Sequence, residues 1–354
     1  MISQRLGKYL DDLERRIDAA VEDDLVGRWT DFWEGRFDDG IFSPRRSRTA
    51  PPGLEWPAVR LNEAIEDFEL MALHQLRMCS EQLAAGGGHL LAVRSNYGTG
   101  ILPSVFGVEM FIMPEETDTL PTSRPVGTIE GIQAILDRGD PDPHGGFGGR
   151  TLEMAHVFEE IRRWYPKIGR YVHHYHPDLQ GPMDVCELLW GSGLFVDLYE
   201  RPAMIHALLD LVTRTYIRFL REWLTIAPQP QPYTCHWGLM QRGTIMLRDD
   251  SAMNLSPEMF DEFIRPYNRR VLDEFGGGSD HFCGRGDHFI GRLTRIEGLY
   301  AVQMSQPHLN DMETIFRHTV DRGIKLLGLD RETAETAETA LAAGRDLHGC
   351  VHCG

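Results

Sequence analysis

The sequence lacks long apolar runs, and its N-terminal region has no apolar segment of the kind that a secretory signal carries. No stretch of its 354 residues approaches the roughly 18 to 20 consecutive apolar residues that a helix needs to span a bilayer. We therefore expect neither a secretory signal nor a membrane partner, and we expect a cytoplasmic location. The six cysteines follow no framework spacing, which favours reduced thiols over disulfides.

Basic residues are also few. The chain has 36 lysines and arginines against 53 aspartates and glutamates, which gives a formal net charge of -17. This balance disfavours nucleic acid or an anionic membrane as the main partner, because both carry negative charge themselves. Apolar residues make up 42% and charged residues 25% of the chain, which is typical of a globular protein with a full core.

Several common motifs of catalysis and cofactor binding are absent. No G-x-G-x-x-G fingerprint follows the first predicted strand, and no phosphate-loop lysine motif occurs. The chain also has no G-x-S-x-G elbow and no H-E-x-x-H pair. These absences disfavour a dinucleotide enzyme, a phosphate-loop enzyme, a serine hydrolase of the elbow type and a zinc peptidase.

Strands and helices are predicted to alternate from about residue 168 onward, which is typical of a parallel β/α fold. Because the alternation is long and the dinucleotide fingerprint is missing, a barrel is favoured over an open sheet. We predict an α/β fold in which residues 61–354 form a single (β/α)8 TIM-type barrel. Residues 1–60 comprise a helix over 1–36 and an irregular loop over 38–60, and we expect this N-terminal helical extension to pack on the barrel.

The densest group of potential ligands lies between residues 279 and 288. If the first part of this stretch is a strand, His281 and Cys283 point to the same side of it. An imidazole and a thiolate on one side are two of the ligands that a zinc ion needs. The alternative is that both residues are simply buried near a loop, as free cysteines often are.

Polar residues also follow other predicted strands, at the carboxyl ends where parallel β/α folds bind ligands. A strand over 89–94 ends at Arg94 and runs into a loop with Asn96 and Tyr97. A second apolar stretch ends in Ile245-Met246-Leu247-Arg248-Asp249-Asp250, so that aspartates follow an apolar strand there as well. The segment 171–182 is predicted as a strand that runs into a loop. Its three clustered histidines, at 173, 174 and 176, are compatible with a metal site or with a polar substrate-lining loop.

A series of short motifs then occurs in one order between about residues 90 and 330. They are Gly100-Ile101-Leu102-Pro103, Phe106-Gly107-Val108-Glu109, Leu179-Gln180-Gly181-Pro182, Asp249-Asp250, Leu255-Ser256-Pro257-Glu258, Phe263-Ile264-Arg265-Pro266-Tyr267, His281-Phe282-Cys283-Gly284 and Ile324-Lys325-Leu326-Leu327-Gly328-Leu329. Together they resemble the uroporphyrinogen decarboxylase superfamily, which also contains zinc-dependent corrinoid:thiol methyltransferases. The resemblance implies a distorted (β/α)8 barrel with its site at the carboxyl ends of the strands.

The resemblance is weaker to the decarboxylases than to the methyltransferases. The decarboxylases carry an aspartate just before the Ile-Leu of the first motif, where this chain has Gly100. Their arginine-rich loop is at best approximated by Arg45, Arg46 and Arg48. Without the acid that handles the pyrrole nitrogens, decarboxylation of uroporphyrinogen III is the alternative and not the leading hypothesis.

The methyltransferases resemble this chain in the His-x-Cys pair and in a late cysteine. The resemblance implies zinc bound by His281, Cys283 and either Cys350 or Cys353, with a substrate thiol that accepts a methyl group from a methyl-corrinoid or similar donor. A metal-free pocket lined by His281 and Cys283 remains open. Asp280, Asp287 or His288 could also hydrogen-bond to the ligands or replace one of them.

The predicted site residues fall into two groups. Asp250, His281 and Cys283 are expected to be catalytic. The residues expected to bind the substrate are Arg94, Asn96, Tyr97, Gln180, His236 and Asp287. The expected partners are a small-molecule substrate, a corrinoid protein and a second copy of the chain in a homodimer. The third functional alternative is a non-catalytic barrel that binds a corrinoid or another ligand.

Overall fold

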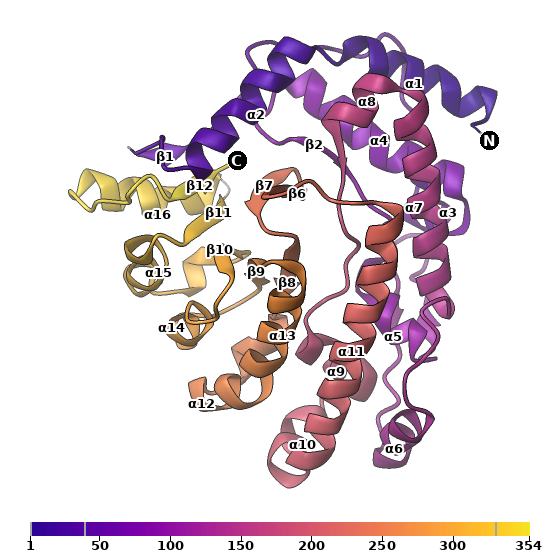
Figure 1. Cartoon of the computed structure of the whole chain (residues 1–354), viewed down its shortest axis with the longest axis vertical. Helices are drawn as coiled ribbons and strands as arrows, with labels where there is room; N and C mark the ends of the chain where they lie inside the picture. Colours follow the sequence, from indigo (N-terminus) through magenta and orange to yellow (C-terminus); the bar gives the residue numbers. More distant parts are fainter. Residues whose placement is uncertain (1, 39, 330) are drawn as a thin grey trace.

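The computed structural model describes residues 2–38, 40–329 and 331–354. Two N-terminal helices, α1 (Gln4–Arg16) and α2 (Ala19–Trp33), occupy the region where the sequence predicted a single helix. The break falls at Asp18, because its carboxylate accepts hydrogen bonds from the backbone N–H groups of Ala20 and Val21 and so caps a new helix. In Figure 1 these two helices cross one end of the molecule.

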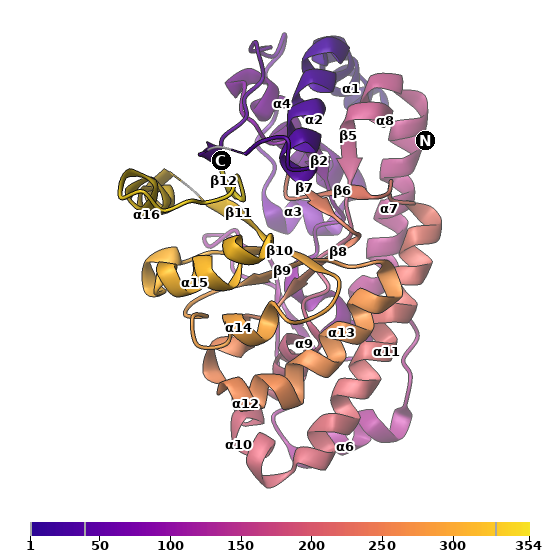
Figure 2. The same cartoon turned by 60° about the vertical axis from the view of Figure 1, so that its left-hand side comes forward.

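A six-stranded parallel sheet forms one half of the molecule, in the order β1-β12-β11-β10-β9-β8. Its strands are β1 (Ile41–Phe42), β8 (Ile245–Arg248), β9 (Gly278–Phe282), β10 (Leu299–Met304), β11 (Lys325–Leu329) and β12 (Val351–Cys353). Helices α14 (Ile290–Leu293), α15 (Met312–His318) and α16 (Arg331–Ala342) lie to one side of these strands in Figures 1 and 2. The alternation predicted for this half of the chain is confirmed.

The other strands form smaller sheets. Strands β2 (Leu91–Val93) and β5 (Val172–His174) pair in parallel, and β6 (Tyr233–His236) and β7 (Leu239–Arg242) form an antiparallel hairpin. A further antiparallel pair joins β3 (Met110–Phe111) to β4 (Thr122–Ser123). Among the described residues, no strand pairs with a strand of another of these sheets. The α/β class is therefore established, whereas closure into an eight-stranded barrel stays a prediction.

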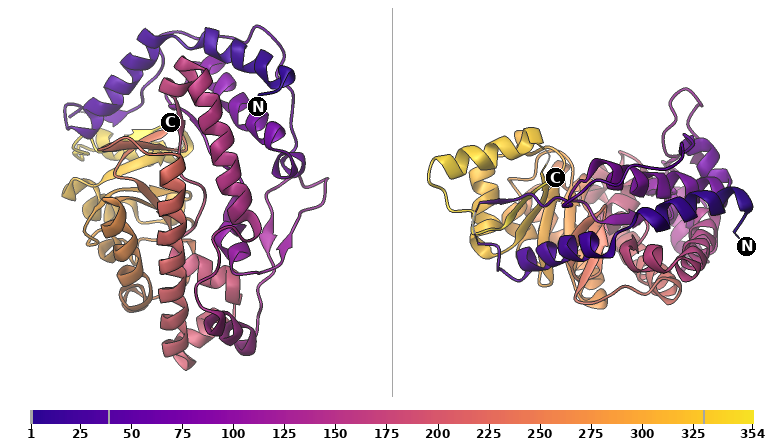
Figure 3. Two further views of the ribbon diagram at one scale, coloured as in Figure 1. Left: turned by 45° about the vertical axis from the view of Figure 1, so that its right-hand side comes forward. Right: turned by 90° about the horizontal axis from the view of Figure 1, so that it is seen from above.

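The remaining helices cover the smaller sheets and the β8 edge of the six-stranded sheet, where α13 (Arg265–Phe275) contacts β8. They are α3 (Leu61–Glu66), α4 (Phe68–Ala85), α5 (Ile101–Val105), α6 (Ile129–Arg138), α7 (Gly146–Trp164), α8 (Pro166–Tyr171), α9 (Pro182–Trp190), α10 (Leu194–Glu200), α11 (Pro202–Ile226), α12 (Pro257–Met259) and α13. The long helices α7 and α11 lie side by side in Figure 3. No helix in the described part of the chain is long and apolar enough to cross a membrane.

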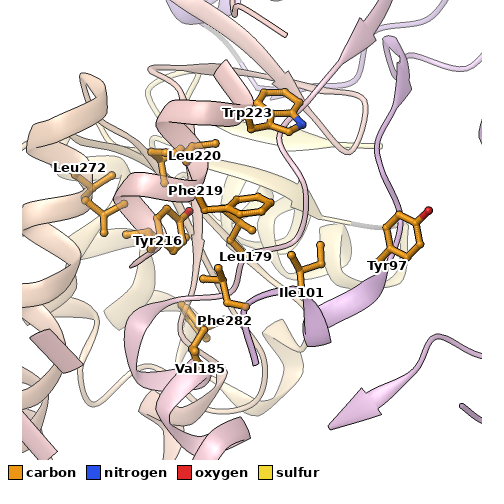
Figure 4. Close-up of a cluster of buried hydrophobic side chains, with 14 of the residues drawn as sticks. Tyr97, Ile101, Leu179, Val185, Tyr216, Phe219, Leu220, Trp223, Leu272 and Phe282 are labelled. Carbon is orange, nitrogen blue, oxygen red and sulfur yellow. The ribbon is translucent and has the colours of Figure 1, made fainter. Parts of the chain in front are cut away.

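The main apolar core lies beneath the strands, against α11. Four side chains of α11 (Tyr216, Phe219, Leu220 and Trp223) are completely buried there. Figure 4 shows Phe282 in the same cluster, with Leu179 and Val185 nearby. Since neighbouring side chains of a strand point to opposite faces, burying Phe282 in this core directs His281 to the other face of β9.

A second apolar cluster attaches the N-terminal helices to the sheet. Trp29 of α2 is fully buried and meets the ring of Phe42 in β1 edge-on, with 5.1 Å between the ring centroids. The indole N–H of Trp33 donates to the backbone carbonyl of Met240 in β7 at 3.0 Å. The β6–β7 hairpin is thus fixed against α2, and its turn at Trp237 and Gly238 is directed into the interior of the molecule.

Candidate functional site

Asp250, His281 and Cys283 converge at the carboxyl ends of the neighbouring strands β8 and β9. One ligand atom from each side chain lies within 4.8 Å of the others. The Nε2 atom of His281 is 3.5 Å from the Sγ atom of Cys283 and 3.8 Å from Oδ1 of Asp250. These are the three residues that the sequence predicted as catalytic, and the structure brings them together.

Gln303 on β10 holds the other ring nitrogen of His281. The Nδ1 atom of the imidazole is hydrogen-bonded to Oε1 of Gln303, which faces His281 across the β9–β10 ladder. Because the amide oxygen accepts, the proton sits on Nδ1 and the lone pair of Nε2 is left facing Cys283. Burial also lowers the pKa of His281, although the Asp250 carboxylate opposes this effect. The ring is therefore neutral and oriented as a metal ligand is.

Asp250 is fixed by two independent contacts. Its backbone N–H donates to the buried carboxylate of Asp184 at 2.9 Å, and its Oδ1 accepts the backbone N–H of Cys283 at 2.7 Å. The side chain of Asp250 is 43% exposed, so this edge of the group is accessible from outside. Neither Asp184 nor Gln303 was predicted from the sequence, because their roles depend on neighbours that are distant along the chain.

The Cys283 thiol is held in its protonated form by its surroundings. Burial, together with the nearby carboxylate of Asp250, raises the pKa of Cys283 to about 11, although a hydrogen bond to Ser305 opposes the shift. At neutral pH the protein alone therefore leaves this sulfur as a weakly nucleophilic thiol. A cation bound at this group would lower the pKa of the thiol and favour the thiolate.

A buried polar network lies beside this group. The carboxylate of Asp178 faces two guanidinium groups, with Arg248 Nε at 3.1 Å and Arg94 Nη1 at 3.4 Å. The side-chain amide of Gln180 donates to the same carboxylate at 2.6 Å. Arg94 and Gln180 were predicted as substrate-binding residues, whereas Asp178 and Arg248 were not. Arg248 lies next to His281 in the β8–β9 register, which places the network adjacent to the Asp250–His281–Cys283 group.

His236, at the end of β6, and Trp237, in the turn that follows, both contact Arg248 of this network. Nε2 of the buried His236 is 2.8 Å from Nη2 of Arg248. The Arg248 guanidinium lies over the ring of Trp237, 4.6 Å from its centroid, and the same ring meets His281 edge-on at 5.1 Å. Trp237 has a φ of 52°, a left-handed conformation that is strained for a bulky residue. A cavity of about 270 Å3 borders this turn, and its lining includes Trp237 and Tyr175.

Three other predicted substrate-binding residues lie in different surroundings. Asn96 is buried, and its Oδ1 atom has no hydrogen-bond partner among the described residues. Tyr97 packs in the apolar core against Phe147, and burial raises its pKa to about 12. Asp287 braces the loop after β9 by accepting hydrogen bonds from Arg285 and from the backbone N–H of Asp311.

The late cysteines are not part of the Asp250–His281–Cys283 group. Cys350 precedes β12, and its thiol is 3.4 Å from the backbone carbonyl of His348. Cys353 ends β12, which β10 and β11 separate from β9 in the order of the sheet. Among the described residues, the third potential ligand that the structure places beside His281 and Cys283 is the carboxylate of Asp250, in the place expected for a late cysteine.

The alternative ligands and the clustered histidines do not join the group either. His288 Nε2 is hydrogen-bonded to the carbonyl of Leu255 at 3.0 Å. His174 is paired with Glu159, and His176 accepts the backbone N–H of Met246 at 3.0 Å. His174 and His176 therefore serve contacts within the fold, whereas His173 lines a cavity together with Arg162 and Arg170.

Two buried carboxyl groups lie directly behind the site. Burial raises the pKa of Asp249 to about 7, against the opposing hydrogen bonds from Asp280 and Asn268. Burial and the charge of Asp249 raise the pKa of Asp280 well above its ordinary value. Asp280 is therefore the member of the pair that retains its proton, and it does not act as a free ligand.

The three arginines that approximate the substrate-binding loop of the decarboxylases do not converge to bind carboxylates. Arg46 is buried, and its guanidinium donates to both carboxylate oxygens of Glu22, at 2.6 and 2.8 Å. Arg48 forms an exposed ion pair with Asp18, and Arg45 is exposed. At Gly100, a side chain would collide with the end of the Met110 side chain.

No protein-family model matches the chain, and a search of curated proteins found no significant match. Among solved structures, a methyltransferase from Methanosarcina mazei matches 93% of this chain and 91% of its own length, with a TM-score of 0.60. The two sequences are 17% identical over the match. At this identity the likeness shows that the two chains share a fold.

Proposed function

We propose that this protein is a methyltransferase that activates a thiol at a metal ion held by His281, Cys283 and Asp250. One observation carries the proposal: an imidazole nitrogen, a thiol and a carboxylate converge within 4.8 Å, and Gln303 holds the Nδ1 atom of the imidazole so that Nε2 faces the other two groups. The shared fold with a methyltransferase supports methyl transfer as the reaction.

The residues fit zinc by their donor chemistry. Nitrogen, sulfur and oxygen donors are those that zinc accepts, and three protein ligands leave a fourth position open for a substrate. A bound zinc ion supplies positive charge that stabilises a thiolate near neutral pH. Gln303 orients the imidazole, and the backbone N–H of Cys283 orients the Asp250 carboxylate. Cys350 and Cys353 remain candidates for a further zinc ligand. Replacing each cysteine by serine and measuring zinc binding tests this role.

In the proposed reaction, the sulfur of a small-molecule thiol attacks the methyl carbon of a methyl-corrinoid. The new S–C bond forms as the Co–C bond breaks, its electron pair stays on cobalt, and the thiol proton passes to solvent. The donor would be presented by a corrinoid protein. We further propose that the two parallel sheets belong to one barrel of the uroporphyrinogen decarboxylase superfamily, and that the chain pairs as a homodimer.

The experiment is a methyl-transfer assay with zinc-loaded protein, methylcobalamin as donor and 2-mercaptoethanol as acceptor. We expect conversion of methylcobalamin, followed by its absorbance, to depend on zinc and to be lost in Cys283→Ser. Loss of carboxylates from uroporphyrinogen III without methyl transfer would establish the decarboxylase alternative. Tight binding of methylcobalamin without turnover would establish the non-catalytic alternative.

A further inference from the structure

The network beside the site contains more positive than negative charge. Arg94 and Arg248 are the two cations, and both pair with the carboxylate of Asp178. Among the ion pairs of the described residues, neither guanidinium has a carboxylate partner other than Asp178, so two positive charges face one negative charge. Arg248 is only 2% exposed, so water does little to compensate its charge.

The other polar side chains of the network add no negative charge. Gln180 is a neutral amide that donates to Asp178. His236 is completely buried, and burial lowers its pKa, so its ring is neutral. Because Nε2 of His236 accepts the hydrogen bond from Arg248, its proton is on Nδ1. That Nδ1 atom is buried and has no partner in the described part of the chain, so an N–H donor is left unused.

This excess of donors is connected to the thiol of Cys283 through Trp237 and His281. Trp237 bridges the two regions, since its ring contacts both the Arg248 guanidinium and the His281 imidazole. Two residues here, Gln180 and Trp237, adopt left-handed backbone conformations, with φ values of 60° and 52°. Strained backbone of this kind is maintained at ligand-binding sites more often than elsewhere.

We propose that Arg94, Arg248 and His236 form a subsite for a carboxylate or similar monoanionic group of the molecule that reacts beside Cys283. A single negative charge would balance the second guanidinium and accept the unused N–H of His236. The subsite follows from charge and geometry alone. Only the statement that the same molecule undergoes methyl transfer rests on the proposed function.

The test compares two alkylating reagents of nearly equal size, iodoacetate and iodoacetamide, on metal-free protein at pH 9. With either reagent, the Cys283 sulfur displaces iodide from the methylene carbon, an S–C bond forms, and the thiol proton passes to the buffer. Peptide mass spectrometry gives the rate at Cys283 for each reagent. The ratio of the two rates, normalised to that of free cysteine, reports preference for the anion.

Replacing Arg94 by Gln should lower this ratio about fivefold, which is the effect of removing one charge at close range in water. Arg94→Lys, which keeps the charge, should retain most of the preference. Arg285→Gln is the matched control, because Arg285 is an exposed arginine two residues from Cys283 that pairs outside the network. An unchanged ratio in Arg94→Gln, or an equal fall in Arg285→Gln, would overturn the subsite. Neither metal nor methyl donor is present, so this result is independent of the proposed reaction.

Discussion

The Nε2 atom of His281 lies 3.5 Å from the Sγ atom of Cys283, with the ring fixed from behind by Gln303. The two side chains belong to one strand end, two residues apart, and Phe282 between them is buried in the apolar core. The alternation of the β-strand thus places His281 and the core residue Phe282 on opposite faces. The imidazole needs no change of tautomer to bind a metal ion.

Gln303 should determine how tightly the metal is held. Gln303→Leu removes the acceptor for the His281 Nδ1–H, so the ring can rotate or change tautomer. We expect zinc affinity to fall about 10- to 100-fold, measured by competition with a chromophoric chelator. Gln303→Glu keeps an acceptor at the same position and should retain most of the affinity. Equal affinity in wild type and Gln303→Leu would contradict the assigned role.

The identity of the third ligand is tested by separate substitutions. Asp250→Asn leaves the side-chain shape nearly unchanged but removes the anionic oxygen, and we expect it to weaken zinc binding about tenfold or more. Cys350→Ser and Cys353→Ser should weaken it less, because the structure does not group their thiols with His281 and Cys283. If Cys353→Ser abolishes binding and Asp250→Asn does not, the late cysteine is the ligand.

Arg46 should contribute to stability and not to substrate binding. Its side chain is 1% exposed and pairs with Glu22, whose side chain is 3% exposed. Arg46→Leu strands a buried carboxylate, and we expect it to lower the free energy of unfolding by about 3–5 kcal/mol. Arg45→Leu, on the exposed neighbour, should change it by less than about 0.5 kcal/mol. Urea denaturation compares them, and equal stability of the two variants would contradict the burial argument.

Asp280 should make the stability of the protein depend on pH. Its pKa is raised in the folded protein, so its contribution is fully present below the unfolded pKa, near 3.8, and is lost as pH rises. The Asp280→Asn variant has no proton to lose at this position. We expect its stability relative to wild type to increase between pH 5 and pH 8, by up to about 1.4 kcal/mol per pH unit.

Thermal unfolding at several pH values measures this effect. Asp273→Asn is the control, because that carboxylate lies on an exposed face of α13 and its side chain is 54% exposed. The control should remain parallel to wild type across the range. A constant difference between Asp280→Asn and wild type at all pH values would show that Asp280 does not retain its proton.

The sequence was sufficient to predict most of the elements in the C-terminal half and to single out His281 and Cys283, at the end of β9, as candidate ligands. His281 and Cys283 could be identified because strand alternation and ligand type are local properties. The alternating pattern likewise predicted the parallel β/α architecture, which depends on chain order. The break between α1 and α2 was missed, although the capping aspartate at position 18 is a recognised signal for a helix start.

Contacts between distant segments could not be predicted in the same way. Gln303 is 22 residues from His281, and nothing in its local sequence distinguishes it from a surface glutamine. Arg248 is the last residue of an apolar strand, and its partner Asp178 lies far away in the chain. Cys350 and Cys353 were predicted as zinc ligands from the family resemblance. Which side chains actually lie beside His281 depends on the order of the strands in the sheet, which the local sequence does not reveal.

Substitution of the metal by Co2+ tests the central claim most directly. A cobalt ion bound by a cysteine thiolate has an intense sulfur-to-metal charge-transfer absorption in the near ultraviolet, which oxygen and nitrogen ligands do not produce. We expect metal-free protein to take up about one Co2+ per chain with this absorption, and Cys283→Ser to lose it while remaining folded. The absence of the absorption in wild type, or its persistence in Cys283→Ser, would contradict a metal centre at His281 and Cys283.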